Sequence, residues 1–332
     1  MTLQERVDAL LRDPYDARLA RSILGTVNSR EICARVEAFV GVPIDACMFV
    51  SLSIGAVFGL VLEDGARVVV KVHAFEPSRE AGFPDLAALD AVYAAQAELH
   101  AVGVPCAAVV QMPVPFGSGA AAVMAYLEPH APDPPHHAGV RRALAALAAQ
   151  IVEQGRSLVS RMRLPRRGLS PDLYPAPHNA LFDFTTPDGG WIDDRARAAR
   201  QVLDRPRHVT SVVAHGDLSC ANVIVSGGRV TNVFDVDSVC WLDELRHVAS
   251  AAVYFTYTGE AGWTWPSRDD ARAFVEDYAA ARAWTPTLAD REVMNAYAIY
   301  ALAYTARCAG ATSTIAQTLA SAADDYLFPR SP

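Results

Sequence analysis

The chain has 332 residues, of which 52% are hydrophobic and 20% are charged, and it carries a formal net charge of −8. Its length exceeds the usual size of a single hydrophobic core, which predicts two lobes or domains, and its composition excludes the disordered and fibrous classes of protein. Because the net charge is negative and the Lys and Arg residues are scattered, the sequence also excludes a nucleic-acid surface that works by neutralising phosphates.

Export and membrane anchoring are not expected either. Charged residues interrupt the first 24 positions, so this segment lacks the apolar centre of a signal peptide. The most apolar stretch, Met294–Ala306, has 13 residues and is too short to span a bilayer. The six cysteines include no C-x-x-C pair, which indicates reduced thiols rather than a metal site. We therefore expect a cytoplasmic protein without a membrane partner.

The first 128 residues are predicted to form two units. Residues 1–45 have apolar side chains at helical spacing, which favours a helical segment. Residues 46–128 alternate short β-rich runs with turns and include one helix, Asp85–Val102, whose apolar residues share a face. This pattern predicts a small β-rich lobe. Its expected strands are Met48–Leu52, Ala56–Leu62, Arg67–Val72, Val104–Gln111 and Ala121–Leu127.

Residues 129–332 are predicted to form a larger, mainly helical lobe. Prolines at positions 129, 132, 134 and 135 interrupt regular structure and mark where it begins. The tryptophans Trp263, Trp265 and Trp284 are interpreted as part of its hydrophobic core. Helices are expected over Val140–Val159, Ile192–Leu203 and most of Leu242–Leu327, and short strands over Val209–Val213 and Val223–Phe234.

The strongest chemical signal is the loop His215–Asn222, which reads H-G-D-L-S-C-A-N between two apolar strands. It matches H-x-D-L-x-x-x-N, the catalytic-loop pattern of kinases. Phosphoryl transfer needs a carboxylate that orients the attacking hydroxyl and, nearby, an amide oxygen that holds a metal ion. Asp217 is therefore the expected base, and Asn222 an expected metal ligand.

A second acidic motif follows in the same order as in kinases. Asp235 and Asp237 end the next β-rich run, where carboxylates can hold Mg²⁺ on the phosphates of a nucleotide. Asp235 is the expected ligand and Asp237 its support. Upstream, Lys71 lies in the middle of an apolar strand, where an unpaired ammonium is costly. It follows a hairpin that holds Ser53 and Gly55, and this placement suits a lysine that binds phosphate.

Together these motifs resemble the aminoglycoside phosphotransferase and choline-kinase-like family. The resemblance implies an α+β, bilobal, protein-kinase-like fold, in which the small lobe binds ATP or GTP with Mg²⁺ and the large lobe binds a small substrate with a hydroxyl group. The nucleotide is then expected at Ser53, Gly55, Lys71, Gln96, Tyr126 and Leu127. Substrate contacts are expected from His178, Asp183 and Glu244.

Two departures from the family pattern leave alternatives open. The usual glutamate partner of the strand lysine is missing, so the partner of Lys71 is Gln96, Glu80, Asp90 or none of them. An aspartate that many family members carry after the metal motif is replaced by His247, and Glu244 is the candidate for its bracing role.

Several functions therefore remain open at the level of sequence. The chain is either a kinase that acts on hydroxyl groups or a nucleotide-binding pseudokinase without turnover. A phosphatase of the haloacid-dehalogenase type is disfavoured, because helical sequence follows Asp235 instead of a β-α-β unit. The acceptor is expected to be cationic if carboxylates of the last helices face the cleft; a neutral sugar or amino alcohol and an anionic compound are the alternatives. Those carboxylates are Glu244, Glu260, Asp269, Asp270, Glu276 and Asp277.

Overall fold

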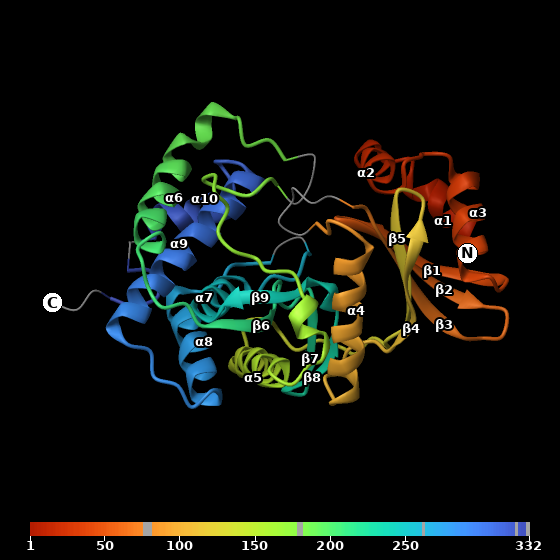
Figure 1. Ribbon diagram of the computed structural model, residues 1–332. Coiled ribbons are helices and arrows are strands. Elements are labelled where there is room, and N and C mark those ends of the chain that lie inside the picture. The colour runs from red at the N-terminus through yellow and green to blue at the C-terminus, as the bar shows by residue number, and fades with distance from the viewer. Residues whose placement is uncertain (76–81, 178–181, 261–262, 323–324, 330–332) are drawn as a thin grey trace.

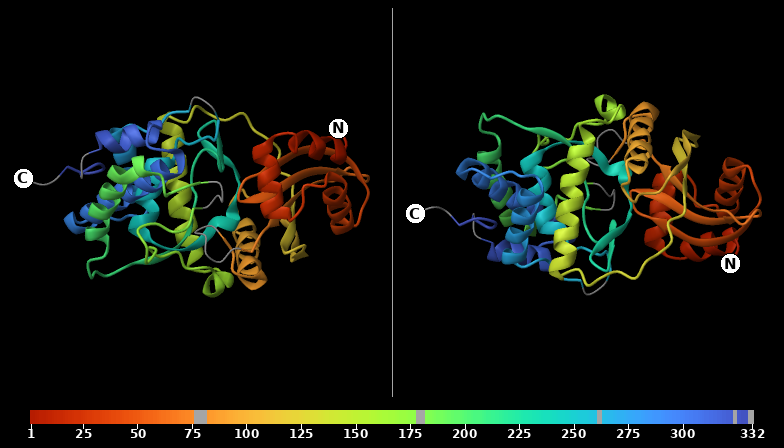
Figure 2. Two further views of the ribbon diagram at one scale, coloured as in Figure 1. Left: turned by 90° about the horizontal axis from the view of Figure 1, so that it is seen from above. Right: turned by 90° about the horizontal axis from the view of Figure 1, so that it is seen from below.

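The computed structural model describes residues 1–75, 82–177, 182–260, 263–322 and 325–329. These residues form a part built on a five-stranded sheet and a mainly helical part beside it (Figure 1). Views from above and below show the N-terminus on the sheet part and the C-terminus at the far end of the helical part (Figure 2). This is the two-lobed, kinase-like arrangement that the sequence motifs predict.

The sheet of the first part is antiparallel throughout, with strand order β1-β2-β3-β5-β4. Its strands are β1 (Ile44–Leu52), β2 (Gly55–Leu62), β3 (Arg67–His73), β4 (Val109–Phe116) and β5 (Gly119–Ala125). The strand expected over Val104–Gln111 begins only at Val109. The preceding segment instead makes an isolated bridge from Cys106 to Val233 in the other lobe.

Helices cover both faces of this sheet. Helices α1 (Leu3–Leu10), α2 (Pro14–Leu24) and α3 (Ser29–Val40) share a hydrophobic core with Val70 and Val72 of β3. Helix α4 (Leu86–Ala101) packs on the opposite face, toward the helical part (Figure 1). Because neighbouring residues of a strand point to opposite faces, Lys71 lies on the face of α4 and the catalytic loop.

The second part places its short strands among helices. The strands are β6 (Ser211–His215) paired with β9 (Val239–Asp243), and β7 (Val223–Ser226) paired with β8 (Arg229–Val233). The helices are α5 (Ala138–Gly155), α6 (Gly190–Leu203), α7 (Glu244–Tyr254), α8 (Arg268–Ala281), α9 (Leu288–Ala309) and α10 (Thr314–Ser321), with short 3₁₀ turns η1 (Ser160–Arg163), η2 (Pro187–Gly189) and η3 (Val236–Ser238).

Helix α9 forms the centre of this part, and most of its residues are buried. A search of the described helices finds none that is both long enough and apolar enough to cross a membrane.

Candidate active site

The antiparallel pairing of β6 with β9 brings the catalytic loop and the acidic motif together. Strand β6 ends at His215 and pairs with β9, which follows the acidic motif. The peptide N–H of Gly216 donates to the carbonyl of Ser238 at 3.3 Å. A Cβ at position 216 would lie 2.8 Å from that carbonyl oxygen, so only glycine permits this close approach.

The hydrogen bonds of His215 fix the catalytic loop and define the tautomer of this histidine. Nε2 lies 2.9 Å from the carbonyl oxygen of Phe234 and therefore donates. Nδ1 then accepts from the N–H of Asp217 at 3.2 Å and from the hydroxyl of Ser238 at 3.0 Å. Since His215 is 1% exposed, these bonds join the catalytic loop to both ends of the acidic motif.

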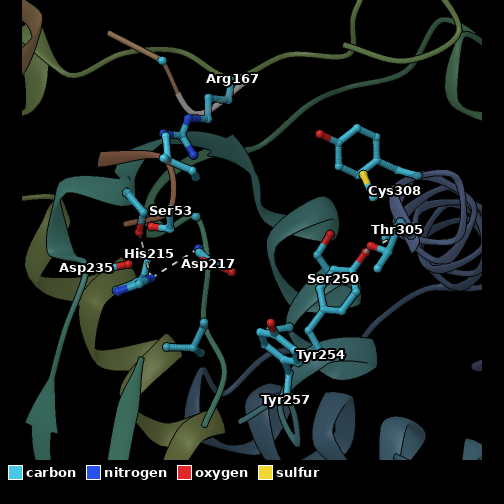
Figure 3. A pocket seen from close by; sticks show the side chains of 18 of the residues that line it. Ser53, Arg167, His215, Asp217, Asp235, Ser250, Tyr254, Tyr257, Thr305 and Cys308 are labelled. Atoms are coloured by element: carbon cyan, nitrogen blue, oxygen red, sulfur yellow. Dashed lines mark hydrogen bonds between the residues drawn. The ribbon is translucent and has the colours of Figure 1, made fainter. Parts of the chain in front are cut away.

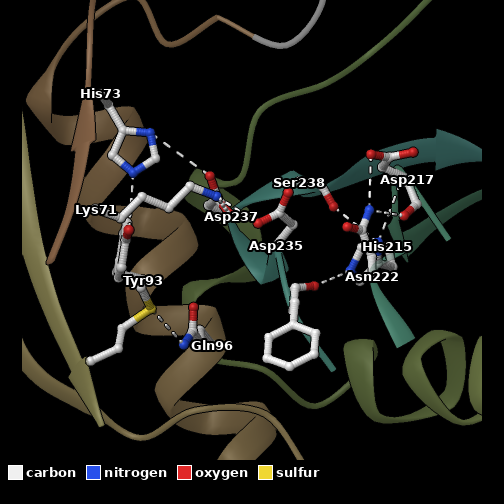
Figure 4. Close-up of polar contacts among 12 residues, drawn as sticks. Lys71, His73, Tyr93, Gln96, His215, Asp217, Asn222, Asp235, Asp237 and Ser238 are labelled. Carbon is white, nitrogen blue, oxygen red and sulfur yellow. Dashed lines mark hydrogen bonds and ion pairs between the residues drawn. The ribbon is translucent and has the colours of Figure 1, made fainter. Parts of the chain in front are cut away.

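Asn222 orients the expected base. Its Nδ2 donates to the carboxylate oxygen Oδ2 of Asp217 at 2.9 Å and to the carbonyl oxygen of the same residue at 2.8 Å (Figure 4). These two bonds occupy the nitrogen of the amide, so the oxygen Oδ1 of Asn222 is the atom left for a metal ion. Asp217 itself is exposed to the cavity described below.

Lys71 reaches both carboxylates of the acidic motif. Its Nζ lies 2.8 Å from Oδ1 of Asp235 and 2.8 Å from Oδ1 of Asp237 (Figure 4). Asp235 adopts a left-handed backbone conformation, with φ of 51° and ψ of 36°, which is uncommon for a residue other than glycine and is typical of functional sites. The side chain of Asp235 is 49% exposed, whereas that of Asp237 is only 14% exposed.

These contacts give Lys71 two acidic partners that the sequence did not suggest. Gln96 donates its amide to the carbonyl of Ala107 at 2.8 Å, and Asp90 pairs with Arg163. Glu80 lies outside the described residues. Among the described residues, the partners of Lys71 are Asp235 and Asp237, more than 160 residues away along the chain.

His73 and Tyr93 complete the environment of Asp237. Nδ1 of His73 lies 3.8 Å from Oδ2 of Asp237, and Nε2 of His73 lies 2.9 Å from the hydroxyl of Tyr93 on α4. Burial lowers the pKa of His73 to about 4 despite the neighbouring Asp237 carboxylate, so this histidine is neutral at pH 7. Tyr93 is thus the residue of α4 that faces the site. No carboxylate of this helix is a partner of Lys71.

The pKa values of the ion pair follow from burial and opposite charge. Burial alone would raise the pKa of Asp237, but the Lys71 ammonium, with a smaller effect of His73, lowers it to about 2. Burial disfavours the charged form of Lys71 as well, yet the two carboxylates hold its pKa above the ordinary value. Lys71 and Asp237 are thus both ionised at neutral pH.

A cavity of about 820 Å³ opens from this cluster. The three aspartates, Lys71 and His73 line one end, together with Ser53 and Gly55 of the β1–β2 turn. Residues of α7, α9, α10 and the segment around Trp263 line the other end. Figure 3 shows Ser250, Tyr254 and Thr305 across the cavity from Ser53 and Asp235.

Other residues that the sequence singled out lie elsewhere. Gln96 is 2% exposed and bonded as described above, and Tyr126 and Leu127 follow β5 as the connection between the lobes; none of the three lines the cavity. Asp183 is exposed outside the cavity and accepts bonds from Thr185.

Glu244 does not brace the catalytic loop. It faces α8, where it accepts bonds from Tyr278 and Arg282. His178, the remaining expected substrate contact, lies outside the described residues.

Arg167, Trp263 and Trp265 line the cavity, although the sequence did not mark them as site residues. Arg167 has an intermediate exposure, and no described carboxylate lies within ion-pair distance of it; its Nη1 approaches Gly216. No motif marks this arginine. Trp265 and Trp284 pack against the hydrophobic core of the helical lobe, as expected, but Trp263 and Trp265 also line the cavity.

The donor set suits a magnesium ion that is shared with a nucleotide. No group of three or more His, Cys, Asp and Glu side chains placed to hold a metal occurs in the described part of the chain. Asp235, Asp237 and the amide oxygen of Asn222 are hard oxygen donors, and Mg²⁺ in such sites takes its other ligands from phosphate and water. These three residues therefore fit a metal that arrives with its nucleotide.

Comparisons with known proteins show the family of this chain and its fold. The model of a family described as phosphotransferase enzyme family matches residues 55–297, whereas a comparison with curated proteins found no match. Among solved structures, the chain is similar to an amicoumacin kinase in complex with AMP-PNP, Ca²⁺ and Ami, with a TM-score of 0.58 and 13% identity over 88% of this chain and 93% of the other.

Two further structures are similar at a comparable level. One is a type I macrolide 2′-phosphotransferase, with a TM-score of 0.51 and 16% identity over 92% of this chain and 96% of the other. The second is a spectinomycin phosphotransferase in complex with ADP and spectinomycin, with a TM-score of 0.51 and 12% identity over 86% and 89% of the two chains. At these identities the similarity shows a shared kinase-like fold.

Proposed function

Because the chain belongs to the phosphotransferase enzyme family, we propose that it transfers the γ-phosphate of ATP or GTP to a hydroxyl group of a small molecule. The observation that carries this proposal is the Asn222 amide, which orients the Asp217 carboxylate and leaves its own oxygen toward a metal. Asp217 is the base, and Asn222, Asp235 and Asp237 are the metal ligands.

The proposed step is a direct displacement at phosphorus. The acceptor oxygen forms a bond to the γ-phosphorus while the bond from that phosphorus to the β–γ bridging oxygen breaks, and the nucleoside diphosphate leaves with the electron pair. Asp217 accepts the hydroxyl proton. Mg²⁺, when bound, would neutralise charge on the phosphate oxygens.

Two cations of this chain support the charge balance of that step. Lys71 lies beside both carboxylates of the acidic motif, where it can bind phosphate oxygens of the nucleotide. Arg167 lines the same cavity beside Gly216, next in sequence to the base. We expect its guanidinium to stabilise negative charge on the transferring phosphate.

The pseudokinase alternative was favoured only by the apparent lack of an acidic partner for Lys71. The sequence suggested that Lys71 lacks an acidic partner, but Lys71 contacts two carboxylates. The resemblance to the family leaves aminoglycoside-like compounds, amino alcohols and sugars as acceptors. The names of the similar structures, which are kinases or phosphotransferases of antibiotics, support a small-molecule acceptor.

The test is transfer of labelled γ-phosphate from ATP and from GTP, with and without Mg²⁺, to a panel of hydroxyl compounds. Nucleotide binding is measured in parallel on the wild type and on Asp217→Asn. We expect both proteins to bind Mg²⁺-nucleotide and only the wild type to label an acceptor. Binding by both proteins without labelling of any acceptor would instead support the pseudokinase.

A further inference from the structure

The far end of the cavity is a wall of aromatic side chains. They come from α7, α9 and the segment between α7 and α8, and they are Tyr254, Tyr257, Trp263, Trp265, Tyr300 and Tyr304. The catalytic loop lies between this wall and the nucleotide end (Figure 3). If the proposed function holds, the acceptor must bind against this wall to present its hydroxyl to Asp217.

Carboxylates of the described residues gather at the catalytic end of the cavity and not at this one. Among the described lining residues, the only carboxylates are Asp217, Asp235 and Asp237, which all belong to the catalytic end. The acidic residues of the C-terminal helices that were expected to attract a cation do not line the cavity. Several are paired elsewhere, as Glu244 is with Arg282 and Asp277 is with Arg141 at 2.8 Å.

Among the described residues, the charges that line the acceptor side are positive. Arg246 lies on the cavity face of α7 and donates to the carbonyls of Arg167 and Gly168 at 3.2 and 2.8 Å. Arg167 lines the same cavity. Like charges in a partly enclosed cleft repel, so this end disfavours an acceptor that carries several ammonium groups.

The aromatic rings are packed against one another and leave no open cage for a single cation. The ring centroids of Trp263 and Trp265 are 4.2 Å apart, and those of Tyr257 and Trp263 are 4.7 Å apart, both edge to face. A cage that binds a quaternary ammonium instead directs several ring faces at one vacant position. Here Trp263 contacts Tyr257 and Trp265 edge to face, so these rings pack on one another rather than around a vacant position, while ring surface still lines the cavity.

Hydrogen bonds fix parts of this wall and direct its polar atoms into the protein. The hydroxyl of Tyr254 bonds to Ala301 and Thr305, and that of Tyr300 donates to the carbonyl of Leu173 at 2.8 Å. Because these phenols are already engaged, the two side chains offer mainly ring carbon to the cavity. Rigid aromatic surface of this kind favours a flat apolar partner.

We propose that the acceptor is an uncharged alcohol that carries an aromatic ring or a similarly flat apolar face. This inference rests on the proposed function for the position of the reacting hydroxyl, and on the aromatic wall for the nature of the rest of the molecule. A polycationic aminoglycoside and choline are then poor acceptors.

The first test measures binding separately from transfer. Phenyl β-glucoside, methyl β-glucoside, kanamycin and choline are titrated calorimetrically against Asp217→Asn in the presence of Mg²⁺ and AMP-PNP. We expect phenyl β-glucoside to bind about 10-fold more tightly than methyl β-glucoside, the scale of one well-placed aromatic contact. Tighter binding of kanamycin or choline than of phenyl β-glucoside, or equal binding of the two glucosides, would overturn the inference.

Variants in the same background then locate the preference. Trp265→Ala and, as a second variant on the more exposed ring, Tyr257→Ala should each reduce the phenyl preference about 3- to 10-fold. Trp191→Ala is the matched control, since Trp191 is 37% exposed on α6 and does not line the cavity. A preference that survives in both cavity variants contradicts the inference.

Transfer by the wild type distinguishes this inference from the proposed function. Phosphorylation of kanamycin in preference to phenyl β-glucoside would refute the acceptor class and leave the kinase function standing. Preferential binding of phenyl β-glucoside without phosphorylation of any alcohol would uphold the aromatic site and count against the kinase function.

Discussion

The pH dependence of protein stability can test whether the buried His247 stays neutral in the folded protein. It lies on α7, is 2% exposed, and its Nε2 is buried without a hydrogen-bond partner among the described residues. Burial, and after it the neighbouring His215, lowers the pKa of His247 from 6.5 to about 3. Between about pH 3 and 6.5, His247 is therefore neutral in the folded protein and protonated in the unfolded chain.

The sign and size of the effect follow from this difference. Since the folded-state pKa is the lower one, the stability contributed by neutral His247 is complete above about pH 6.5 and is lost as the pH falls toward 3. Each pH unit below 6.5 costs about 1.4 kcal/mol, so the free energy of unfolding should fall by about 2 kcal/mol by pH 5 from this residue alone. Replacement by leucine removes the titration and the unpartnered nitrogen together.

The assay is urea unfolding of the wild type and His247→Leu at pH 7.5, 6 and 5, without nucleotide. At pH 7.5 we expect the two to differ by less than about 1 kcal/mol, because the lost ring contact with Tyr278 is offset by removal of a buried polar atom. At pH 5 the variant should be the more stable protein by about 2 kcal/mol. His208→Leu, which removes an exposed histidine, is the matched control. Parallel pH curves for wild type and His247→Leu would refute a buried, neutral His247.

Three further predictions concern the catalytic end. Asp217→Ala should keep the thermal midpoint of the wild type and lose at least about 100-fold in kcat; near wild-type turnover on an established acceptor would exclude Asp217 as the base. Titration of Mg²⁺ against AMP-PNP binding should show a larger loss of affinity in Asp235→Ala and Asn222→Ala than in Asp237→Ala, and the reverse order would exchange the roles of the two aspartates. Arg167→Gln should lower kcat about 100-fold with an unchanged KM for the acceptor, and Arg167→Lys should recover part of it; an effect on KM alone would place Arg167 in acceptor binding.

The sequence predicts well those features of the candidate site that depend on local structure. His215 to Asn222 form a loop between two strands because apolar runs flank a polar segment, and the spacing of this segment alone brings Asn222 back to Asp217. Lys71 was assigned to a strand of the small lobe because valines surround it, and it lies in β3. Such features depend on a few consecutive residues, which the sequence displays directly.

Features that depend on distant partners were not predictable in the same way. Lys71 pairs with carboxylates on a segment that follows β8, whereas the expected partner belonged to the next helix along the chain. The sequence does not predict strand β9 (Val239–Asp243), whose last two residues fall in the expected helical region, because this segment is short and becomes a strand only by pairing with β6. Trp263 and Trp265 have the composition of a core, and only the tertiary structure shows that they also line a cavity.

The same limitation explains why the expected acceptor charge differs from the one that the cavity supports. A count of acidic residues in the last helices treats every carboxylate as available to a substrate. In the folded chain, Arg282 pairs with Glu244, and Arg141 pairs with both Asp270 and Asp277. These ion pairs connect α5, α7 and α8. Each carboxylate needs its arginine, because a partly buried charge without a partner is destabilising. The arginines thus remove negative charge from the reach of a ligand, and the part of the cavity that remains is defined by aromatic rings.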